Sequence, residues 1–278
     1  MLPDFDAGWI GAKGERAPFL TYAAAAANWS DELEAMHADS SRDHFLDVWT
    51  RTAILERVVV DRPGANIVDL GCSSGYLLAD ISRAHADALL IGVDLVTGGL
   101  RKAHALVPSA RRGQADACNL PLADGSVDAI VSANLLEHIA DDDAALREVR
   151  RVLRPGASAT IVVPAGARTY DYYDRFLGHE RRYAHGELAT KASQAGLRVV
   201  EDAYIGSLLY PAFWLVKQRN RRLYGHLEGE QLERRGAADI ENTAGSRVGD
   251  ALRRIEVGLG LRLPFGIRNL VVLSAEPR

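Results

Sequence analysis

The sequence is poor in cysteine, with only Cys72 and Cys118 among 278 residues. Two thiols exclude a disulfide framework and a cysteine-rich metal site, and they fit a reducing compartment, so we expect a cytoplasmic protein. The sequence also lacks a charge-free apolar run of the length that crosses a membrane. Its first residues, MLPDFDAGWIGAK, contain neither a basic n-region nor a long apolar h-region, and we therefore expect no signal peptide.

An excess of positive charge is also missing, because the formal net charge is -4. Phosphate binding usually leaves a basic footprint, so this balance argues against nucleic acid as the main partner. Hydrophobic residues make up 47% and charged residues 25%, the composition of a soluble protein with ample core. A chain of 278 residues indicates one large α/β domain with a cap or insertion, and the abundant alanine and arginine favour a bacterial source.

A tight glycine turn organises the chain. It lies in the stretch IVDLGCSSGYLLADI, from Ile67 to Ile81, between a short apolar strand that Asp69 closes and an amphipathic helix. Gly71 and Gly75 bracket the turn and let a ligand lie close against the backbone, while free N–H groups at the helix start face that ligand. The stretch predicts a cofactor site; a strand, turn and helix without a ligand is the alternative.

The spacing of the glycines in this turn distinguishes between two kinds of cofactor. A dinucleotide turn needs glycines where this chain has Ser73 and Tyr76, and Tyr76 would block the close helix packing that the third glycine permits. The order Asp69-x-Gly71-x-Ser73-x-Gly75 instead resembles motif I of the class I S-adenosylmethionine-dependent methyltransferases, acidic-x-Gly-x-Gly-x-Gly, with serine at the middle glycine.

Acidic and amide side chains follow the next predicted strands. The strand Leu89–Asp94 ends in an acid that can hold both ribose hydroxyls of either kind of cofactor. After a third strand, Asp116 matches the family's adenine-binding acid, and Asn134 ends the fourth strand, which in this family lies beside the sulfonium. Leu136-Glu137-His138 then matches the "LEH" signature of the large methyltransferase group.

The following helix and strand agree with the same family. The run Asp141 to Asp143 is favourable at a helix start, Leu153-Arg154-Pro155-Gly156 ends that helix, and a fifth strand ends at Pro164. Together these blocks imply S-adenosylmethionine as cofactor, S-adenosylhomocysteine as product and no metal. The cofactor-binding residues implied by the resemblance are Asp69, Gly71, Cys72, Ser73, Gly75, Asp94, Leu95, Asp116, Ala117 and Asn134.

The resemblance implies a Rossmann-like, doubly wound, seven-stranded α/β sheet. We expect a helical N-terminal cap over residues 1–62, the cofactor-binding core over 63–205, a helical insertion over 206–262 and the last strand over 263–278. The cap is predicted to be helical from Phe19 to about Val60, including the alanine run 23–27 and an N-cap at Ser30 or Asp31.

Residues 168–183 are polar and aromatic and precede a helix and a strand. Their text resembles the "LGHxRRY" stretch of bacterial small-molecule and glycan methyltransferases, where acceptor-facing loops lie. Arg181 and Arg182 can hold a phosphate or carboxylate in bidentate fashion, although an ion-paired loop is the alternative. The substrate-binding residues expected here are Tyr172, Tyr173, Arg181, Arg182 and Tyr183.

Methyl transfer to a hydroxyl benefits from a general base, and histidine is the side chain whose pKa is nearest neutral. His179 lies in the acceptor stretch and His138 lies near the expected sulfonium, although a structural role is the alternative for His138. With Glu180 these are the expected catalytic residues. The other histidines lack metal-ligand spacing, and an acidic helix start explains Asp141 to Asp143, so we expect no metal requirement.

The insertion begins with SLLYPAFWLVKQRNRRLYG, which passes from apolar to basic. A core helix with a basic end, a hydrophobic wall for a prenyl or lipid-linked acceptor, and a membrane-surface helix remain open. Peripheral contact with a lipid-linked acceptor is therefore a possible partner interaction, without a membrane span. The chain is expected to be a monomer or a homodimer.

The expected activity is methyl transfer to a small-molecule acceptor, foremost the oxygen of a natural product or sugar. Carbon methylation of an isoprenoid or polyketide is the first alternative, in which Glu180, Tyr172 and Tyr173 would hold a carbocation. A non-catalytic cofactor-binding protein is the second. The presence of both Asp94 and Asp116 argues against this second alternative, because a site that no longer acts on its cofactor does not need two carboxylates at these positions.

Overall fold

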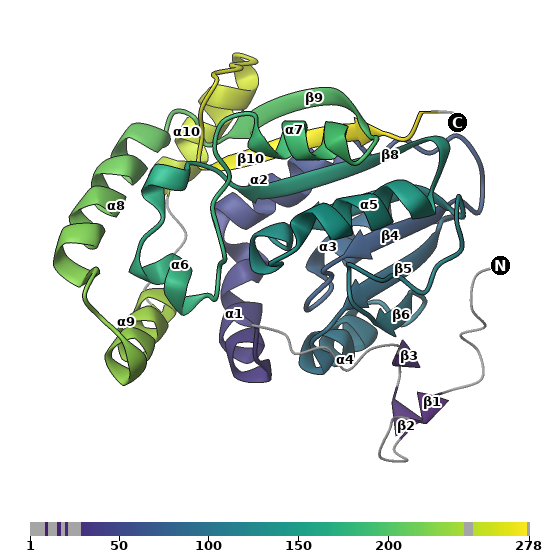
Figure 1. The fold of residues 1–278 in the computed structure, drawn as a ribbon, viewed down its shortest axis with the longest axis horizontal. Helices are drawn as coiled ribbons and strands as arrows, with labels where there is room; N and C mark the ends of the chain where they lie inside the picture. Colours follow the sequence, from purple (N-terminus) through teal and green to yellow (C-terminus); the bar gives the residue numbers. More distant parts are fainter. Residues whose placement is uncertain (1–8, 11–15, 18–19, 22–28, 242–246, 277–278) are drawn as a thin grey trace.

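One mixed β-sheet forms the centre of the protein (Figure 1). The computed structural model describes residues 9–10, 16–17, 20–21, 29–241 and 247–276. In spatial order the strands are β3 (Leu20–Thr21), β6 (Arg111–Gln114), β5 (Leu89–Asp94), β4 (Asn66–Leu70), β7 (Val127–Ala133), β8 (Leu153–Pro164), β10 (Arg268–Ser274) and β9 (Arg198–Ile205). Strands β3 to β8 of this order are parallel, and β10 is antiparallel to both of its neighbours.

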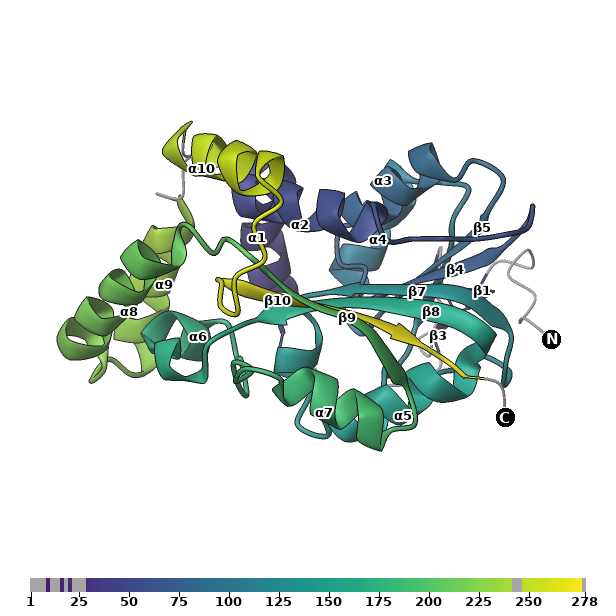
Figure 2. The same cartoon turned by 90° about the horizontal axis from the view of Figure 1, so that it is seen from above.

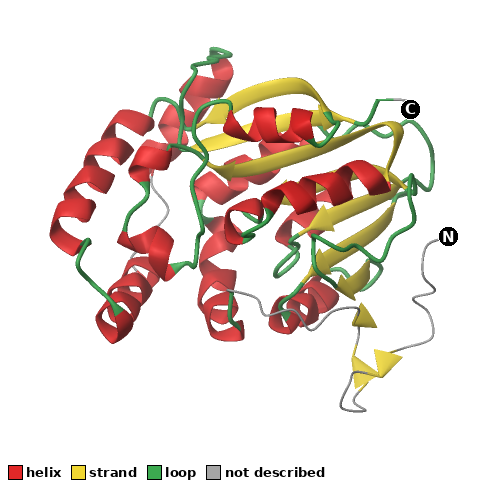
Figure 3. Cartoon of the chain, viewed as in Figure 1, coloured by secondary structure: helices red, strands yellow, loops and turns green. Residues whose placement is uncertain are grey.

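Helices cover both faces of the sheet (Figures 2 and 3). Helices α2 (Phe45–Leu55), α3 (Tyr76–Ala84) and α4 (Thr97–Leu106) lie on one face, and α5 (Asp142–Val152) and α7 (Glu187–Gln194) lie on the other. Because both faces are covered, the central strands β4 and β7 are buried along most of their length and are mainly apolar, as parallel strands of doubly wound sheets are.

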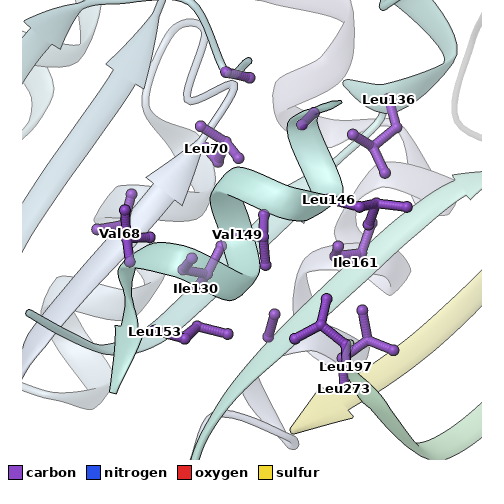
Figure 4. Close-up of a cluster of buried hydrophobic side chains, with 14 of the residues drawn as sticks. Val68, Leu70, Ile130, Leu136, Leu146, Val149, Leu153, Ile161, Leu197 and Leu273 are labelled. Carbon is purple, nitrogen blue, oxygen red and sulfur yellow. The ribbon is translucent and has the colours of Figure 1, made fainter. Parts of the chain in front are cut away.

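Alternate residues of each strand enter two separate cores. Val68 of β4 and Ile130 of β7 pack with α5, whereas Ile67 of β4 packs with α2 and α3. Figure 4 shows Leu146 and Val149 of α5 among the strand side chains of the first core. These cores fix the strand ends from which the polar residues project.

The remaining described helices lie before β4 or beyond the sheet end at which the parallel strands finish. They are α1 (Asp31–Asp43), α6 (Tyr172–Phe176), α8 (Tyr210–Tyr224), α9 (Gly229–Glu241) and α10 (Arg247–Gly258), with 3-10 turns η1 (Leu136–His138) and η2 (Ala167–Thr169). Strands β1 (Trp9–Ile10) and β2 (Arg16–Ala17) form a separate pair. Figure 1 shows α6, α8 and α9 grouped at one end of the molecule.

The predicted α/β fold is confirmed: seven strands form the expected sheet, and β3 extends its edge beside β6. Helix α1 begins at Asp31, where the Ser30 hydroxyl accepts a hydrogen bond from Leu33 N at 3.1 Å, as the capping pattern predicts. The prediction of one helical region from Phe19 to Val60 is wrong in part. Leu20–Thr21 are a strand because they pair with β6, and α2 already ends at Leu55. The predicted alanine helix at 23–27 lies outside the described residues.

None of the described helices is long and apolar enough to span a bilayer.

Candidate functional site

A cavity of about 840 Å³ opens at the carboxyl ends of β4, β5, β7 and β8. Ligands of open α/β sheets bind at this edge, because the loops that leave the strands diverge there. All ten residues predicted to bind the cofactor line this cavity: Asp69, Gly71, Cys72, Ser73, Gly75, Asp94, Leu95, Asp116, Ala117 and Asn134.

The glycine turn after β4 is shaped by close backbone packing. Gly71 and Gly75 have φ of +79° and +82°, in the left-handed region that favours glycine. A Cβ atom on Gly71 would lie 2.9 Å from Leu135 Cβ, and one on Gly75 would lie 2.8 Å from the Cα atom of Ala103. The turn therefore requires glycine at both positions, and α3 begins directly after Gly75.

Two buried carboxyl groups of the strand ends converge behind this turn. Asp94 accepts hydrogen bonds from Ser73 N and Val96 N, each at 2.8 Å, and burial raises the pKa of Asp94 to about 6. Burial and the charge of Asp94 raise the pKa of Asp69 to about 8. Oδ2 of Asp69 is buried without a hydrogen-bond partner among the described residues.

Glu34 is a third carboxylate at the turn, and the sequence analysis did not identify it. It reaches the turn from α1, is 2% exposed, and accepts hydrogen bonds from Ser73 Oγ at 2.7 Å and Ser74 Oγ at 2.6 Å. Trp29 Nε1 donates to its second oxygen at 3.0 Å. These contacts hold α1 over the turn. The composition of α1 does not predict these contacts of Glu34, because acidic residues in the first turn are also common on exposed helices.

The remaining two strand ends supply Asp116 and Asn134. Asp116 Oδ1 accepts a hydrogen bond from Cys118 N at 2.8 Å, which fixes the loop after β6. Asn134 has a positive φ of +54°, a conformation that asparagine tolerates better than most residues, and its N–H donates to Val162 O at 2.8 Å. This backbone turn directs the segment 135–139 across the cavity.

A histidine–carboxylate cluster lies where that segment meets the loop between α6 and α7. The rings of His138 and His179 are 4.7 Å apart between centroids. Glu137 is fully buried, its pKa is raised by that burial, and neither carboxylate oxygen has a hydrogen-bond partner among the described residues. One ligand atom from each of the three residues lies within 4.8 Å of the others, so the cluster has the donor set and the size to hold a metal ion.

His179 is oriented by a buried carboxylate, which the sequence analysis also did not identify. Its Nδ1 lies 2.9 Å from Oδ1 of Asp174. Asp174 also pairs with Arg182 Nε at 2.6 Å and with Lys217 Nζ at 3.2 Å. Burial alone would raise the pKa of Asp174, but the hydrogen bond with His179 and the charges of Arg182 and Lys217 outweigh it and hold this pKa well below its usual range. Asp174 therefore stays ionised and leaves Nε2 of His179 for a ligand.

The acceptor stretch is only partly brought to the cavity. His138, His179, Glu180, Tyr172, Tyr173 and Arg182 line it. Arg181 and Tyr183, which are also predicted to bind substrate, do not line it. Both contact Asp142 instead, through an ion pair at 2.7 Å and a hydrogen bond at 2.7 Å. The physical reason is the extended backbone at Tyr183, which bridges Ala165, so side chains on either side of Arg182 point away from the cavity.

The insertion completes the wall opposite the glycine turn. Phe213 and Lys217 of α8 and Asp239 of α9 line the cavity, and Lys217 Nζ lies 5.5 Å from the centroid of the Phe213 ring. The hydroxyl of Tyr172 donates to Asp239, which fastens α9 to α6. These contacts link residues far apart in the sequence, so no local motif could have revealed them.

Comparison with known proteins agrees with this geometry. Residues 68–161 match the family model described as a methyltransferase domain. The chain is similar to the O-methyltransferase resE of Aspergillus sclerotiorum, with 30% identity over 183 residues that cover 61% of this chain and 68% of the relative. It is also similar to the demethylmenaquinone methyltransferase of Corynebacterium kroppenstedtii, with 34% identity over 40% of this chain and 50% of the relative. The match to a further bacterial relative spans only 34% of that protein's length.

A solved structure of similar fold is a methyltransferase in a complex with the Haloferax volcanii Trm112 methyltransferase activator. It superimposes with a TM-score of 0.62 at 21% identity and covers 89% of this chain and 96% of that one. At this identity the likeness concerns the fold. The domain match, the identity with resE and the shared fold together show that the chain belongs to the class I S-adenosylmethionine-dependent methyltransferases.

Proposed function

We propose that the protein transfers a methyl group from S-adenosylmethionine to a hydroxyl oxygen of a small, uncharged acceptor. The observation that carries this proposal is the orientation of His179 by Asp174 inside the same cavity that all ten predicted cofactor residues line. A histidine held at Nδ1 by a carboxylate presents Nε2 as a proton acceptor, and general bases of this kind typically accelerate a reaction by about 10²–10⁴-fold.

The residues at the glycine turn fit the cofactor. S-adenosylmethionine carries an ammonium and a sulfonium cation, and the carboxyl groups of Glu34, Asp69 and Asp94 lie at the turn. The absence of a Cβ atom on Gly71 and Gly75 lets the turn pack against Leu135 and Ala103. We propose that Asp94 binds the ribose hydroxyls, that Asp116 binds the adenine amino group, and that the backbone of residues 71–75 lies against the methionine part.

When bound, the cofactor supplies an electrophilic methyl group, and the chain's task is to orient the acceptor and to take its proton. We propose that Nε2 of His179 takes the proton from the acceptor hydroxyl, while His138 and Glu180 position the acceptor. The low pKa of Asp174 keeps a negative charge beside the imidazolium that forms. This mechanism requires no metal, although the nearby cluster can accommodate one.

The charges in the cavity favour an acceptor without an anionic group. Each Lys and Arg side chain of the described lining already pairs with a carboxylate: Arg51 with Asp80, Arg182 with Asp174, Lys217 with Asp171, and Arg268 with Asp47. Binding a phosphate would require breaking such a pair, which leaves a buried charge uncompensated. A neutral aromatic or apolar natural product fits the wall formed by Tyr172, Tyr173 and Phe213 better.

Oxygen as the attacking atom is supported by the similarity to resE, which is named an O-methyltransferase. We further propose the four segments 1–62, 63–205, 206–262 and 263–278 as N-terminal cap, core, insertion and final strand, and a cytoplasmic location, which the two free thiols favour.

Carbon methylation is the second candidate, favoured by the similarity to a demethylmenaquinone methyltransferase. In this case Tyr172, Tyr173 and Glu180 would stabilise a carbocation rather than position a hydroxyl. The 13C NMR spectrum of the methylated product distinguishes the two, because a methyl group on oxygen and one on carbon have different carbon chemical shifts.

Calorimetric titration with S-adenosylmethionine and S-adenosylhomocysteine, with NAD as the control, tests the cofactor assignment. We expect both sulfur ligands to bind and NAD not to bind. An Asp94→Ala variant should lose binding by roughly 10²-fold, since hydrogen bonds to a charged group contribute about 1.5–3 kcal/mol each. An Asp94→Ala protein that binds S-adenosylmethionine as tightly as the parent would contradict the assignment.

A further inference from the structure

Helix α8 has an exposed apolar surface in addition to the residues with which it lines the cavity. Its inner stripe, which includes the partly buried Phe213 and the buried Lys217, faces the cavity. On the side away from this stripe, Trp214 and Leu215 are 40% and 62% exposed, and Val216, at the margin of the cavity, is 53% exposed. Nine of the fourteen exposed large hydrophobic side chains of the described residues lie between positions 214 and 265, so the exposure is concentrated on the insertion.

Basic side chains continue this surface along the same helix. Arg219 lies one turn after Leu215, and Arg222 lies one turn after Arg219, so the three share a face. Among the described residues, neither Arg219 nor Arg222 has an ion-pair partner. The α8 patch, defined as Trp214, Leu215, Val216, Arg219 and Arg222, therefore joins exposed apolar groups to free positive charge.

We infer that the α8 patch is a docking surface for a bilayer that contains anionic lipids. An interfacial helix buries its apolar side chains at the boundary between headgroups and acyl chains, while arginine side chains meet anionic headgroups. Tryptophan is enriched at this boundary because its ring is apolar and its N–H is polar. Figures 1 and 2 both place α8 at the outer end of the molecule, where a flat surface can approach it.

The patch borders the opening of the cavity. Val216 is half-exposed and lines the cavity as well, and Phe213 on the preceding part of α8 forms its apolar wall. A bilayer seated on the patch would therefore lie beside the acceptor end of the site. This part of the inference rests on the proposed function: it assigns the acceptor to apolar, membrane-dissolved hydroxyl compounds. The docking itself is measurable without any acceptor.

The experiment is co-sedimentation of the full chain with vesicles of phosphatidylcholine alone and of phosphatidylcholine mixed with phosphatidylglycerol. We expect binding to the mixed vesicles, a weaker interaction at high salt, and a blue shift of tryptophan fluorescence that Trp214→Phe removes. Leu215→Ser and Arg219→Glu should each weaken vesicle binding at least tenfold. Val59→Ser and Lys102→Glu are matched controls, because both alter exposed side chains far along the chain from α8 and should bind like the parent.

Three outcomes would overturn the inference. They are no binding to mixed vesicles, equal loss in the control variants, and a homodimer in light scattering that Leu215→Ser separates, which would make the patch a subunit interface. Thermal unfolding of each variant verifies that it folds. Calorimetry with S-adenosylmethionine on the same samples separates the two proposals, since a protein that binds cofactor but no vesicle contradicts the docking and leaves the methyltransferase assignment intact.

Discussion

Nδ1 of His179 and Oδ1 of Asp174 lie 2.9 Å apart, in a part of the protein where both side chains are buried. Asp174 belongs to α6, and His179 follows the end of that helix. Because Arg182 and Lys217 also pair with Asp174, the carboxylate is fixed from three directions. The imidazole, which lines the cavity, is therefore fixed at Nδ1 before any acceptor arrives.

Replacing His179 by alanine should lower kcat by about 10²–10⁴-fold, because the proposed proton acceptor is removed. The dissociation constant for S-adenosylmethionine should stay within about twofold, since His179 lies outside the glycine turn. Added imidazole should restore part of the activity. His185→Ala is the control, because that ring contacts Tyr204 and does not line the cavity. Unchanged turnover in His179→Ala would remove this residue from the mechanism.

Cofactor affinity should fall as the pH drops through about 6. The pKa of Asp94 is raised to about 6, so acidification below this value protonates the carboxylate that is proposed to accept the ribose hydroxyls. Since binding favours the ionised form, the dissociation constant should rise by up to tenfold per pH unit below 6. Calorimetry between pH 5 and pH 8 measures this. An Asp94→Asn variant should bind weakly throughout and lose the inflection near pH 6, whereas Asp69→Asn should retain it.

Gly75→Ala should destabilise the protein more than Gly186→Ala. Both glycines precede a helix and have positive φ, of +82° and +69°. A Cβ atom on Gly75 would meet the Cα atom of Ala103 at 2.8 Å, whereas one on Gly186 meets nothing within 4 Å. We expect a loss of unfolding free energy of about 1 kcal/mol for Gly186→Ala and about 3 kcal/mol for Gly75→Ala, from backbone strain and overpacking. Urea denaturation of the pair measures the difference, and equal losses would show that the close approach to α4 relaxes at little cost.

Prolonged dialysis against EDTA should leave turnover unchanged, because the proposed mechanism uses Nε2 of His179 for the proton rather than for a metal. Metal analysis of the purified protein should find no stoichiometric ion. A large loss of activity that zinc or another divalent ion restores would instead place a metal on Glu137, His138 and His179, and it would replace the general base by a metal-bound hydroxyl of the acceptor.

The sequence predicted the sheet well because its signals are local. The strand Leu89–Asp94 and the helix start at Asp141 to Asp143 lie where periodicity and capping place them, and Asp141 accepts a hydrogen bond from Ala144 N at 2.9 Å. The prediction was wrong at Leu20–Thr21, since pairing with β6 is decided by a strand almost a hundred residues away. The local secondary-structure propensity of residues 20–21 does not indicate which distant strand they pair with.

The sequence by itself determined the α/β fold and the glycine turn, because the signals for each strand, turn and helix lie within short stretches of chain. Tertiary structure decided the acceptor side. It brought Glu34 to Ser73 across 39 residues and Lys217 to Asp174 across 43, and it turned Arg181 away while Arg182 faces the cavity. Such contacts depend on how the helices pack against one another. The sequence therefore gives the chemical type of each residue, but it does not identify the distant residue that contacts it.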